Sequence, residues 1–169
     1  KEQIIPSGHN SNDYIVERLE CYSHDKRLIP ITITRHKNTP VNGSANLLLY
    51  GYGSYGSSMT PNFSSTRLSL INRDIIWVSA HIRGGMEKGM KWWKEGKLLN
   101  KKNTFEDYVA VAKFLIEKNY TSKGNIIGMG GSAGGLLMGA VVNKNPELFK
   151  GIVMAVPFVD SLTTNLDHS

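Results

Sequence analysis

Ser132 stands in the stretch "GMGGSAGG", residues 128–135, where glycines and other small residues surround a single hydroxyl group. Gly130 and Gly134 lie two residues before and two residues after it, which completes the pattern G-x-S-x-G. This pattern has chemical meaning only between a strand and a helix, where a sharp turn presents a nucleophilic serine. The strand-like "NIIGM" before it and the helix-like "AGGLLMGAVVN" after it meet that condition, so the sequence predicts a nucleophile elbow.

The glycines of this predicted elbow have a physical purpose. The incoming strand and the outgoing helix nearly touch at such a turn, so side chains at positions 130 and 134 would collide. The helix that begins after Ser132 directs free backbone N–H groups and its dipole at the place where an oxyanion would form. We therefore expect the N–H of Ala133 to contact that oxyanion.

Two other interpretations of the glycine-rich turn compete with the elbow. The glycines could simply allow close packing of a strand and a helix, or the turn could cradle a phosphate. A P-loop would continue with Lys followed by Ser or Thr, and a dinucleotide site would keep a different glycine spacing with an acidic residue after a second strand. The sequence has neither feature, so we favour the nucleophile elbow.

Hydrophobic periodicity predicts the elements that must position Ser132. Residues 13–23 and 27–37 alternate apolar and polar side chains, which predicts an antiparallel pair of lead-in strands within residues 1–46. Apolar runs at 47–53, 75–82, 125–129 and 151–159 predict strands covered on both faces, and residues 133–143 predict a helix. The alternation of strands and helices indicates an α/β fold with a mostly parallel sheet.

A further helix is predicted from Thr104, because apolar residues recur at helical spacing up to Ile116. Thr104 is expected to cap this helix, with Asp107 completing an approximate capping box. Asn119 and Gly124 bracket the predicted end of the helix. The polar connector at residues 38–46 reads as a loop and not as a linker between domains.

Composition narrows the possible classes of protein. The 169 residues, of which 40% are hydrophobic, fit one ordinary globular domain, and the longest apolar runs are too short to span a membrane. Cys21 is the only cysteine, so no internal disulfide is possible, and no charged-then-apolar leader opens the chain. We expect a cytoplasmic protein without a membrane partner.

The net charge of +6 raises the alternative of nucleic-acid binding. The densest basic cluster, residues 88–102, places lysines around Trp92 and Trp93, a combination that could stack on single strands. No recognised nucleic-acid motif organises these residues, so we favour a solvated loop whose tryptophans pack inward. The five histidines show no spacing typical of metal ligands.

Several stretches together resemble the catalytic domain of the prolyl oligopeptidase family of serine peptidases, most closely its oligopeptidase B (protease II) branch. The resemblance implies an α/β-hydrolase fold and an endopeptidase that cleaves short peptides through an acyl-enzyme on Ser132, without a cofactor. It covers nearly all of the chain from Leu47 onward. The matching stretches are "LLLYGYGSYG" (47–56), "HIRGGMEKGMKWWKEGK" (81–97), "KKNTFEDY" (101–108), "GGSAGGLLMG" (130–139), "NPELFKG" (145–151) and "VPFVDSLTTNLD" (156–167).

The resemblance also implies roles for individual residues. Tyr52 matches the tyrosine whose hydroxyl gives the second oxyanion contact, although alone it would read as an aromatic residue at a strand end. Tyr55 and Arg83 are assigned to substrate binding. Arg83 could instead hold a neighbouring carboxylate or brace the glycine loop. His81 is expected to be structural, because the family's catalytic histidine follows the serine in the order Ser, Asp, His.

The base and the acid of the catalytic triad are not found in this sequence. After Ser132 the only histidine is His168, and we expect Asp160, Asp167 and His168 to be ordinary loop residues. The chain therefore looks like part of a peptidase domain, without the family's β-propeller, and we expect no turnover from it alone. Residues 151–159 would then form an exposed edge strand, and another chain could complete the fold.

Specificity is less visible in the sequence than the nucleophile. Thr60 and Asn62 stand where oligopeptidase B relatives carry acidic side chains that help to select basic residues. Preference for cleavage after Arg or Lys is therefore implied by the overall resemblance alone. An esterase or acyl-peptidase on the same fold, a non-catalytic remnant and a peptide-binding module remain alternatives.

Overall fold

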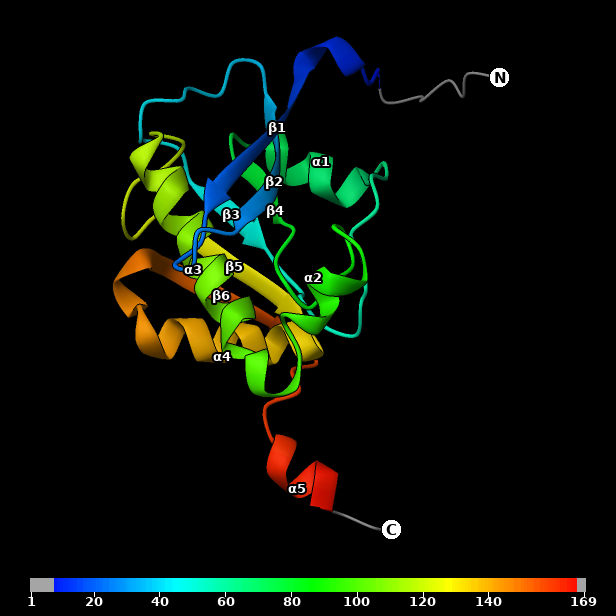
Figure 1. The fold of residues 1–169 in the computed structure, drawn as a ribbon. Helices are drawn as coiled ribbons and strands as arrows, with labels where there is room; N and C mark the ends of the chain where they lie inside the picture. Colours follow the sequence, from blue (N-terminus) through cyan, green and yellow to red (C-terminus); the bar gives the residue numbers. More distant parts are fainter. Residues whose placement is uncertain (1–7, 167–169) are drawn as a thin grey trace.

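Six strands form a single sheet in the computed structural model, which describes residues 8–166 of the chain (Figure 1). Their order across the sheet is β1-β2-β4-β3-β5-β6, so the chain crosses over between neighbouring strands. The strands are β1 (Tyr14–Tyr22), β2 (Leu28–His36), β3 (Leu47–Tyr50), β4 (Ile76–Ala80), β5 (Ile126–Gly131) and β6 (Phe149–Ala155). The predicted α/β class with a mostly parallel sheet is confirmed.

The first two strands form the antiparallel hairpin that their alternating pattern predicts. Their register runs from Tyr14 opposite His36 to Tyr22 opposite Leu28. Strand β2 then pairs antiparallel with β4, from Ile31 opposite Ala80 to Thr34 opposite Trp77. The lead-in hairpin is therefore the beginning of the same sheet and not a separate layer.

Strands β4, β3, β5 and β6 pair in parallel. Because parallel strands end at the same edge, the loops that follow β3, β4 and β5 meet at one rim of the sheet. Those loops carry "GYG" at 51–53, "HIRGG" at 81–85 and Ser132. The topology thus gathers the sequence-predicted site residues at the carboxyl edge of the sheet.

Helices lie on both faces of the sheet. Helix α3 (Lys102–Glu117) and helix α4 (Ala133–Lys144) contact each other, and α4 packs along β5 and β6. On the other face, α1 (Ser65–Ile71) places Arg67 over the ring of Trp77, whose neighbours Ile76 and Val78 belong to the main core. No helix within residues 8–166 is long and apolar enough to cross a membrane.

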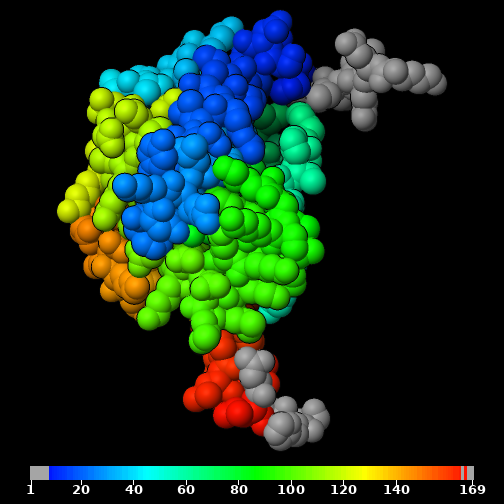
Figure 2. Space-filling view, viewed as in Figure 1, coloured from blue at the N-terminus to red at the C-terminus, as the bar shows by residue number. Residues whose placement is uncertain are grey.

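Short helical segments complete the chain. Helices α2 (Met90–Lys94) and α5 (Ser161–Leu166) and the 3-10 turns Ser11–Asp13, Leu98–Asn100 and Pro146–Leu148 lie between or beside the main elements. Figure 2 shows α5 projecting from the body of the molecule. Trp92 of α2 is buried and donates its indole N–H to the His81 carbonyl at 3.1 Å, whereas Trp93 is half-buried beneath Lys97. Both rings therefore pack against the protein.

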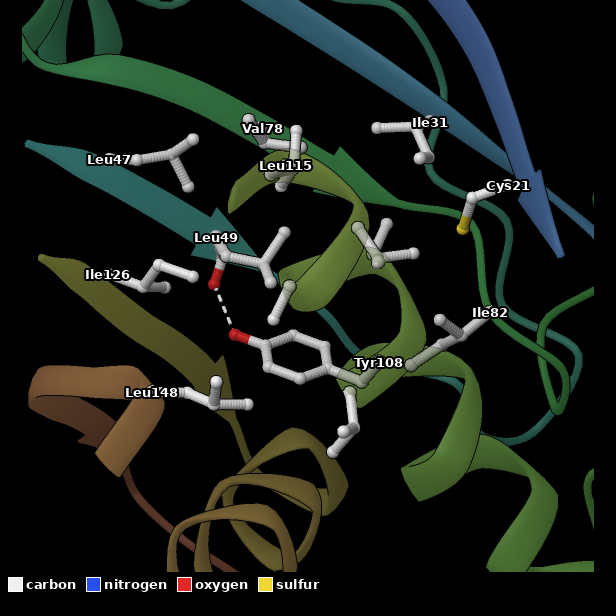
Figure 3. Close-up of a cluster of buried hydrophobic side chains, with 14 of the residues drawn as sticks. Cys21, Ile31, Leu47, Leu49, Val78, Ile82, Tyr108, Leu115, Ile126 and Leu148 are labelled. Carbon is white, nitrogen blue, oxygen red and sulfur yellow. Dashed lines mark hydrogen bonds between the residues drawn. The ribbon is translucent and has the colours of Figure 1, made fainter. Parts of the chain in front are cut away.

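The main core lies between the sheet and helices α3 and α4. Figure 3 shows Tyr108 of α3 reaching across this core towards β3, among buried side chains. The Tyr108 hydroxyl donates a 2.6 Å hydrogen bond to the Leu49 carbonyl. The other labelled core residues in that view are Cys21, Ile31, Leu47, Leu49, Val78, Ile82, Leu115, Ile126 and Leu148.

The capping box predicted for Thr104 and Asp107 is wrong. Helix α3 begins at Lys102, so both residues lie inside the helix, and both are fully buried. The Thr104 hydroxyl donates to the carbonyls of Arg83 and Gly96 at 2.8 and 3.2 Å. Both side chains form hydrogen bonds with the loop after β4 and therefore do not cap the helix.

Strand β6 is not covered on both faces, contrary to the pattern of residues 151–159. It begins at Phe149, ends at Ala155 and forms an edge of the described sheet, with Val153 and Met154 each 44% exposed. Within residues 8–166 no further strand lies beside it. The expectation of an exposed apolar edge strand is therefore confirmed.

The Tyr108 hydrogen bond predicts a stability effect. Replacing Tyr108 with Phe removes the donor and leaves the Leu49 carbonyl without this buried partner, so we expect unfolding to become easier by about 1–2 kcal/mol. Urea unfolding followed by circular dichroism measures this difference. Tyr22→Phe is the matched control, because Tyr22 is exposed. Equal stability of the two variants would contradict the assigned role of the Tyr108 hydroxyl.

Candidate active site

Ser132 lies at the turn between the end of β5 at Gly131 and the start of α4 at Ala133. Its backbone angles are φ 54° and ψ −117°, a strained combination for a residue with a side chain. Its side chain is exposed, and its hydroxyl makes no capping bond to α4. The serine therefore stands clear of the helix that follows it, as a nucleophile elbow requires.

Main-chain hydrogen bonds hold Ser132 in this conformation. Its N–H donates to the Ala155 carbonyl of β6 at 2.9 Å. Its carbonyl accepts from the N–H groups of Gly135 and Phe158 at 2.8 and 2.9 Å. Three hydrogen bonds thus hold Ser132 in its strained conformation. Two of them connect it to the end of β6 and to the segment that follows β6.

The glycines of the motif allow close approach of main chains. A side chain at Gly130 would collide with the backbone carbonyl of Gly134, the second residue of α4. A Cβ at Gly134 would lie 2.9 Å from the Gly51 carbonyl in the loop after β3. These two positions therefore bring β5, α4 and the loop after β3 together, which is the purpose that the sequence pattern suggests for them.

Ala133 and Tyr52 lie on either side of this contact. Ala133 is buried at the first position of α4, where a backbone N–H has no acceptor within the helix. A Cβ at Gly134 would be 3.4 Å from Cδ2 of Tyr52, so the tyrosine ring packs beside the first turn of α4. Burial, with smaller effects of Tyr55 and Tyr50, raises the pKa of Tyr52, which keeps its hydroxyl protonated and able to donate.

Arg83 is buried, and its guanidinium contacts protein carboxylates. Only 1% exposed, it donates from its backbone N–H and Nε to Oδ2 of Asp107 at 3.0 and 2.8 Å. Its Nη2 reaches Oδ1 of Asp107 at 2.6 Å, and its Nη1 reaches Asp25 at 2.6 Å. The guanidinium is thus occupied by two protein carboxylates.

The Arg83 cluster joins three parts of the fold. Asp107 comes from α3, Asp25 from the turn between β1 and β2, and Ser23 of that turn donates to Asp107 at 2.6 Å. Burial favours a lower pKa for Arg83, but hydrogen bonds and charges from Asp107 and Asp25 outweigh it and raise the pKa above its ordinary value. This geometry supports the alternative in which Arg83 holds carboxylates and braces the glycine loop.

Tyr55 and His81 have opposite environments. Tyr55 is 76% exposed on the loop after β3, where its ring is open to solvent. His81 is buried, and its Nε2 lies 2.9 Å from Nη1 of Arg18 and 2.8 Å from Oγ1 of Thr32. Because arginine only donates, Nε2 of His81 must accept, which fits the structural role expected for this histidine.

The described residues provide no base for Ser132. Asp160 accepts a 3.0 Å bond from the N–H of Thr163 and so serves the first turn of α5 locally. Asp167 and His168 lie outside the described residues. No group of three or more His, Cys, Asp or Glu side chains in the described part of the chain could hold a metal ion.

Two residues near the site were missed by sequence reasoning. The local pattern around Asp107 predicts a helix cap, whereas the side chain is buried between Thr104 and Tyr108 and pairs with Arg83. Lys101 donates to the Gly53 carbonyl and the Ser54 hydroxyl at 2.6 and 2.7 Å, directly after Tyr52. No local sequence signal distinguishes Lys101 from the other lysines of residues 88–102.

The mostly parallel sheet and the strained serine between β5 and α4 define the class: the chain has an α/β-hydrolase fold with a nucleophile elbow. The model of the prolyl oligopeptidase family matches residues 61–169, more than half of the chain. The chain therefore belongs to the prolyl oligopeptidase family. The resemblance drawn from the sequence is confirmed.

Known proteins support the oligopeptidase B branch. Protease 2 of Moraxella lacunata is 53% identical over 169 residues, and dipeptidyl aminopeptidase BI of Pseudoxanthomonas mexicana is 48% identical over 168 residues, each over 99% of this chain. The solved structure of oligopeptidase B from Leishmania major superposes with a TM-score of 0.91 at 45% identity over 95% of this chain. The chain spans only 22–24% of the length of these three proteins.

The packing of the elbow predicts opposite effects of two glycine substitutions. Gly130→Ala places a methyl group against the Gly134 carbonyl, so we expect a loss of about 2–3 kcal/mol in unfolding free energy. Gly139→Ala, later in α4 and with nothing within 4 Å of the new methyl group, should stabilise by about 0.5–1 kcal/mol. Urea unfolding of both variants is the check, and a neutral Gly130→Ala would refute the close approach.

The Arg83 cluster predicts a large loss of stability when its cation is removed. Arg83→Ala leaves the Asp107 carboxylate buried and uncompensated, which should cost about 3–5 kcal/mol. Arg27→Ala, which removes a more exposed ion pair with Glu95, should cost less than about 1 kcal/mol. Thermal and urea unfolding compare the two, and similar small losses would show that Arg83 does not brace the loop.

Proposed function

We propose that this chain carries the nucleophile and the oxyanion-binding groups of a serine peptidase that hydrolyses short peptides. The observation that carries the proposal is the strained, exposed Ser132 between β5 and α4, beside the Ala133 N–H and the Tyr52 ring. Membership of the prolyl oligopeptidase family supports a peptide as the substrate. No metal or organic cofactor takes part, because the nucleophile and the donors are protein groups.

In the proposed reaction, Oγ of Ser132 attacks the carbonyl carbon of the scissile peptide bond while a base takes its proton. The carbonyl oxygen becomes an oxyanion, which accepts hydrogen bonds from the Ala133 N–H and the Tyr52 hydroxyl. Collapse of this intermediate breaks the C–N bond, and the base returns the proton to the leaving amine. Water then attacks the acyl-enzyme by the same steps and releases Ser132.

The base and its orienting acid come from outside residues 8–166 in this proposal. A serine hydroxyl alone is a weak nucleophile, so we expect the 169-residue chain by itself to show no turnover. Further strands of the domain, or another chain, would join at the exposed edge of β6. The last residue of β6, Ala155, accepts the hydrogen bond from the Ser132 N–H.

We further propose that the protein acts in the reducing cytoplasm, because its sequence has only one cysteine.

Cleavage after Arg or Lys is the substrate preference that we propose. The preference is implied by the resemblance to the oligopeptidase B branch, and the similarity to Protease 2 and to oligopeptidase B from Leishmania major supports that branch. Thr60 and Asn62 are exposed and neutral, so these two positions do not provide a carboxylate for a basic side chain. The acidic groups that recognise the basic residue would therefore lie elsewhere in the complete site.

Release of dipeptides from the N-terminus of a substrate is a second candidate activity. It is favoured by the 48% identity to a protein described as dipeptidyl aminopeptidase BI. An esterase or acyl-peptidase with the same elbow is a third, because one nucleophile serves many leaving groups. The three activities differ in the substrate that reacts fastest, so one set of assays separates them.

A chimera allows the proposed activity to be tested. In this Protease 2 chimera, the present chain replaces the matching segment of Protease 2 from Moraxella lacunata, of which it covers 24%. We expect hydrolysis of a blocked arginyl peptide amide to exceed that of a free dipeptidyl amide and of a simple ester. Ser132→Ala should lower kcat by a factor of about 10³ or more.

The outcomes of this assay are distinct. Undiminished hydrolysis in the Ser132→Ala chimera would contradict the role of Ser132. Faster reaction with the dipeptidyl amide would contradict the proposed endopeptidase activity and support dipeptidyl-peptidase activity. Ser132 would remain the proposed nucleophile in that case. Turnover by the 169-residue chain alone, lost on Ser132→Ala, would show that the base lies within this chain.

A further inference from the structure

The main chain around Tyr52 is tied to the fold at a small number of points. The Gly51 N–H donates to the Met129 carbonyl of β5 at 3.1 Å, and the Gly56 N–H donates to the Gly84 carbonyl at 2.9 Å. Within residues 8–166, hydrogen bonds that reach the Tyr52–Gly53 main chain from elsewhere in the fold come from Lys101 alone. The segment that carries Tyr52 is thus hydrogen-bonded to the rest of the fold at both ends and, at its Tyr52–Gly53 main chain, by the side chain of Lys101.

Lys101 makes two short bonds in this position. Its Nζ donates to the Gly53 carbonyl at 2.6 Å and to the Ser54 hydroxyl at 2.7 Å. Gly53 has φ +66° and packs tightly against Thr104 and Ile82, and Ser54 is buried. A cation that donates to a carbonyl forms a stronger bond than a neutral donor, and more so where water is excluded.

The placement of Lys101 is electrostatically unfavourable. It stands at the N-terminus of α3, where the helix dipole disfavours a positive charge. Among the described residues it forms no ion pair, and burial lowers its pKa to about 8. A lysine that served only solubility would extend into water, as the exposed Lys102 beside it does.

We propose that Lys101 is a positioning residue for the peptidase reaction: its ammonium group fixes the main chain directly after Tyr52 and so sets the place of the Tyr52 hydroxyl. This inference rests on the proposed function, in which that hydroxyl donates to the oxyanion. Such a donor stabilises the transition state only when it lies within hydrogen-bond distance of the developing charge. A displacement of about 1 Å lowers the rate by about 10²-fold.

The local part of the proposal is tested on the 169-residue chain. Lys101→Cys should raise the hydrogen-exchange rates of the hydrogen-bonded amides of Gly51 and Gly56 by about tenfold or more, because the segment between them loses its central tie. Treatment with 2-bromoethylamine restores an amine of nearly the same length and should restore slow exchange. Cys21 is buried and burial raises its thiol pKa to about 12, so it should not react. Lys102→Cys, treated in the same way, is the matched control.

The catalytic part is tested by a double-mutant cycle in the Protease 2 chimera. Lys101→Met should lower kcat by about 10- to 100-fold with KM changed less than twofold, because ground-state contacts remain. Tyr52→Phe should lower kcat by about 10²-fold. If Lys101 acts through Tyr52, Lys101→Met adds less than about threefold to the loss in the Tyr52→Phe background.

Two results would overturn the proposal: unchanged exchange of the Gly51 and Gly56 amides in Lys101→Cys, or fully additive losses in the cycle. A variant that fails to fold is replaced by Ser54→Ala, which removes one acceptor of Lys101 and should give a smaller increase in exchange at the same amides. Failure of the proposed function is separate, because it appears as hydrolysis that survives Ser132→Ala. The exchange measurement does not depend on Ser132.

Discussion

Three loops leave one edge of the sheet and approach each other so closely that side chains cannot fit between them. Gly130 faces the Gly134 carbonyl, Gly134 faces the Gly51 carbonyl, and Gly84 faces the Gly53 carbonyl. This close approach sets Ser132 on a strained turn beside Tyr52. The sheet topology, the positions of α3 and α4 and the candidate site all depend on it, because each loop is in place only while its neighbours are.

Two cations, the buried Arg83 and the half-buried Lys101, hold these loops from the side of α3. Arg83 joins the loop after β4 to Asp107 of α3 and to Asp25 of the lead-in hairpin. Lys101 reaches the loop after β3 from the residue before α3. The first cation is compensated by carboxylates and contributes to stability. The second has no ion-pair partner within residues 8–166 and is explained by the main chain that it positions. The hairpin and α3 thus support a site that neither of them lines.

The sequence predicts much of this fold and part of its site. The elbow, the strand pattern and the family resemblance follow from local motifs and periodicity, which depend on residues near each other in the chain. The partners of Arg83 do not, because Asp25 lies 58 residues before it and its approach depends on the folded hairpin. Thr104 and Asp107 matched a capping box locally, yet their side chains bond to the loop after β4. The exposure of β6 depends on which strands lie beside it in the sheet, and the hydrophobic pattern of its own residues does not encode those neighbours.

The central claim, that the elbow makes Ser132 a nucleophile once a base is present, has one direct measurement. The Protease 2 chimera and the 169-residue chain are each treated with a fluorophosphonate serine-hydrolase probe, and intact mass is recorded. The account predicts one adduct on the chimera, none on its Ser132→Ala variant, and none on the chain alone. An adduct that persists in the Ser132→Ala chimera would contradict it, because another residue would then be the reactive nucleophile.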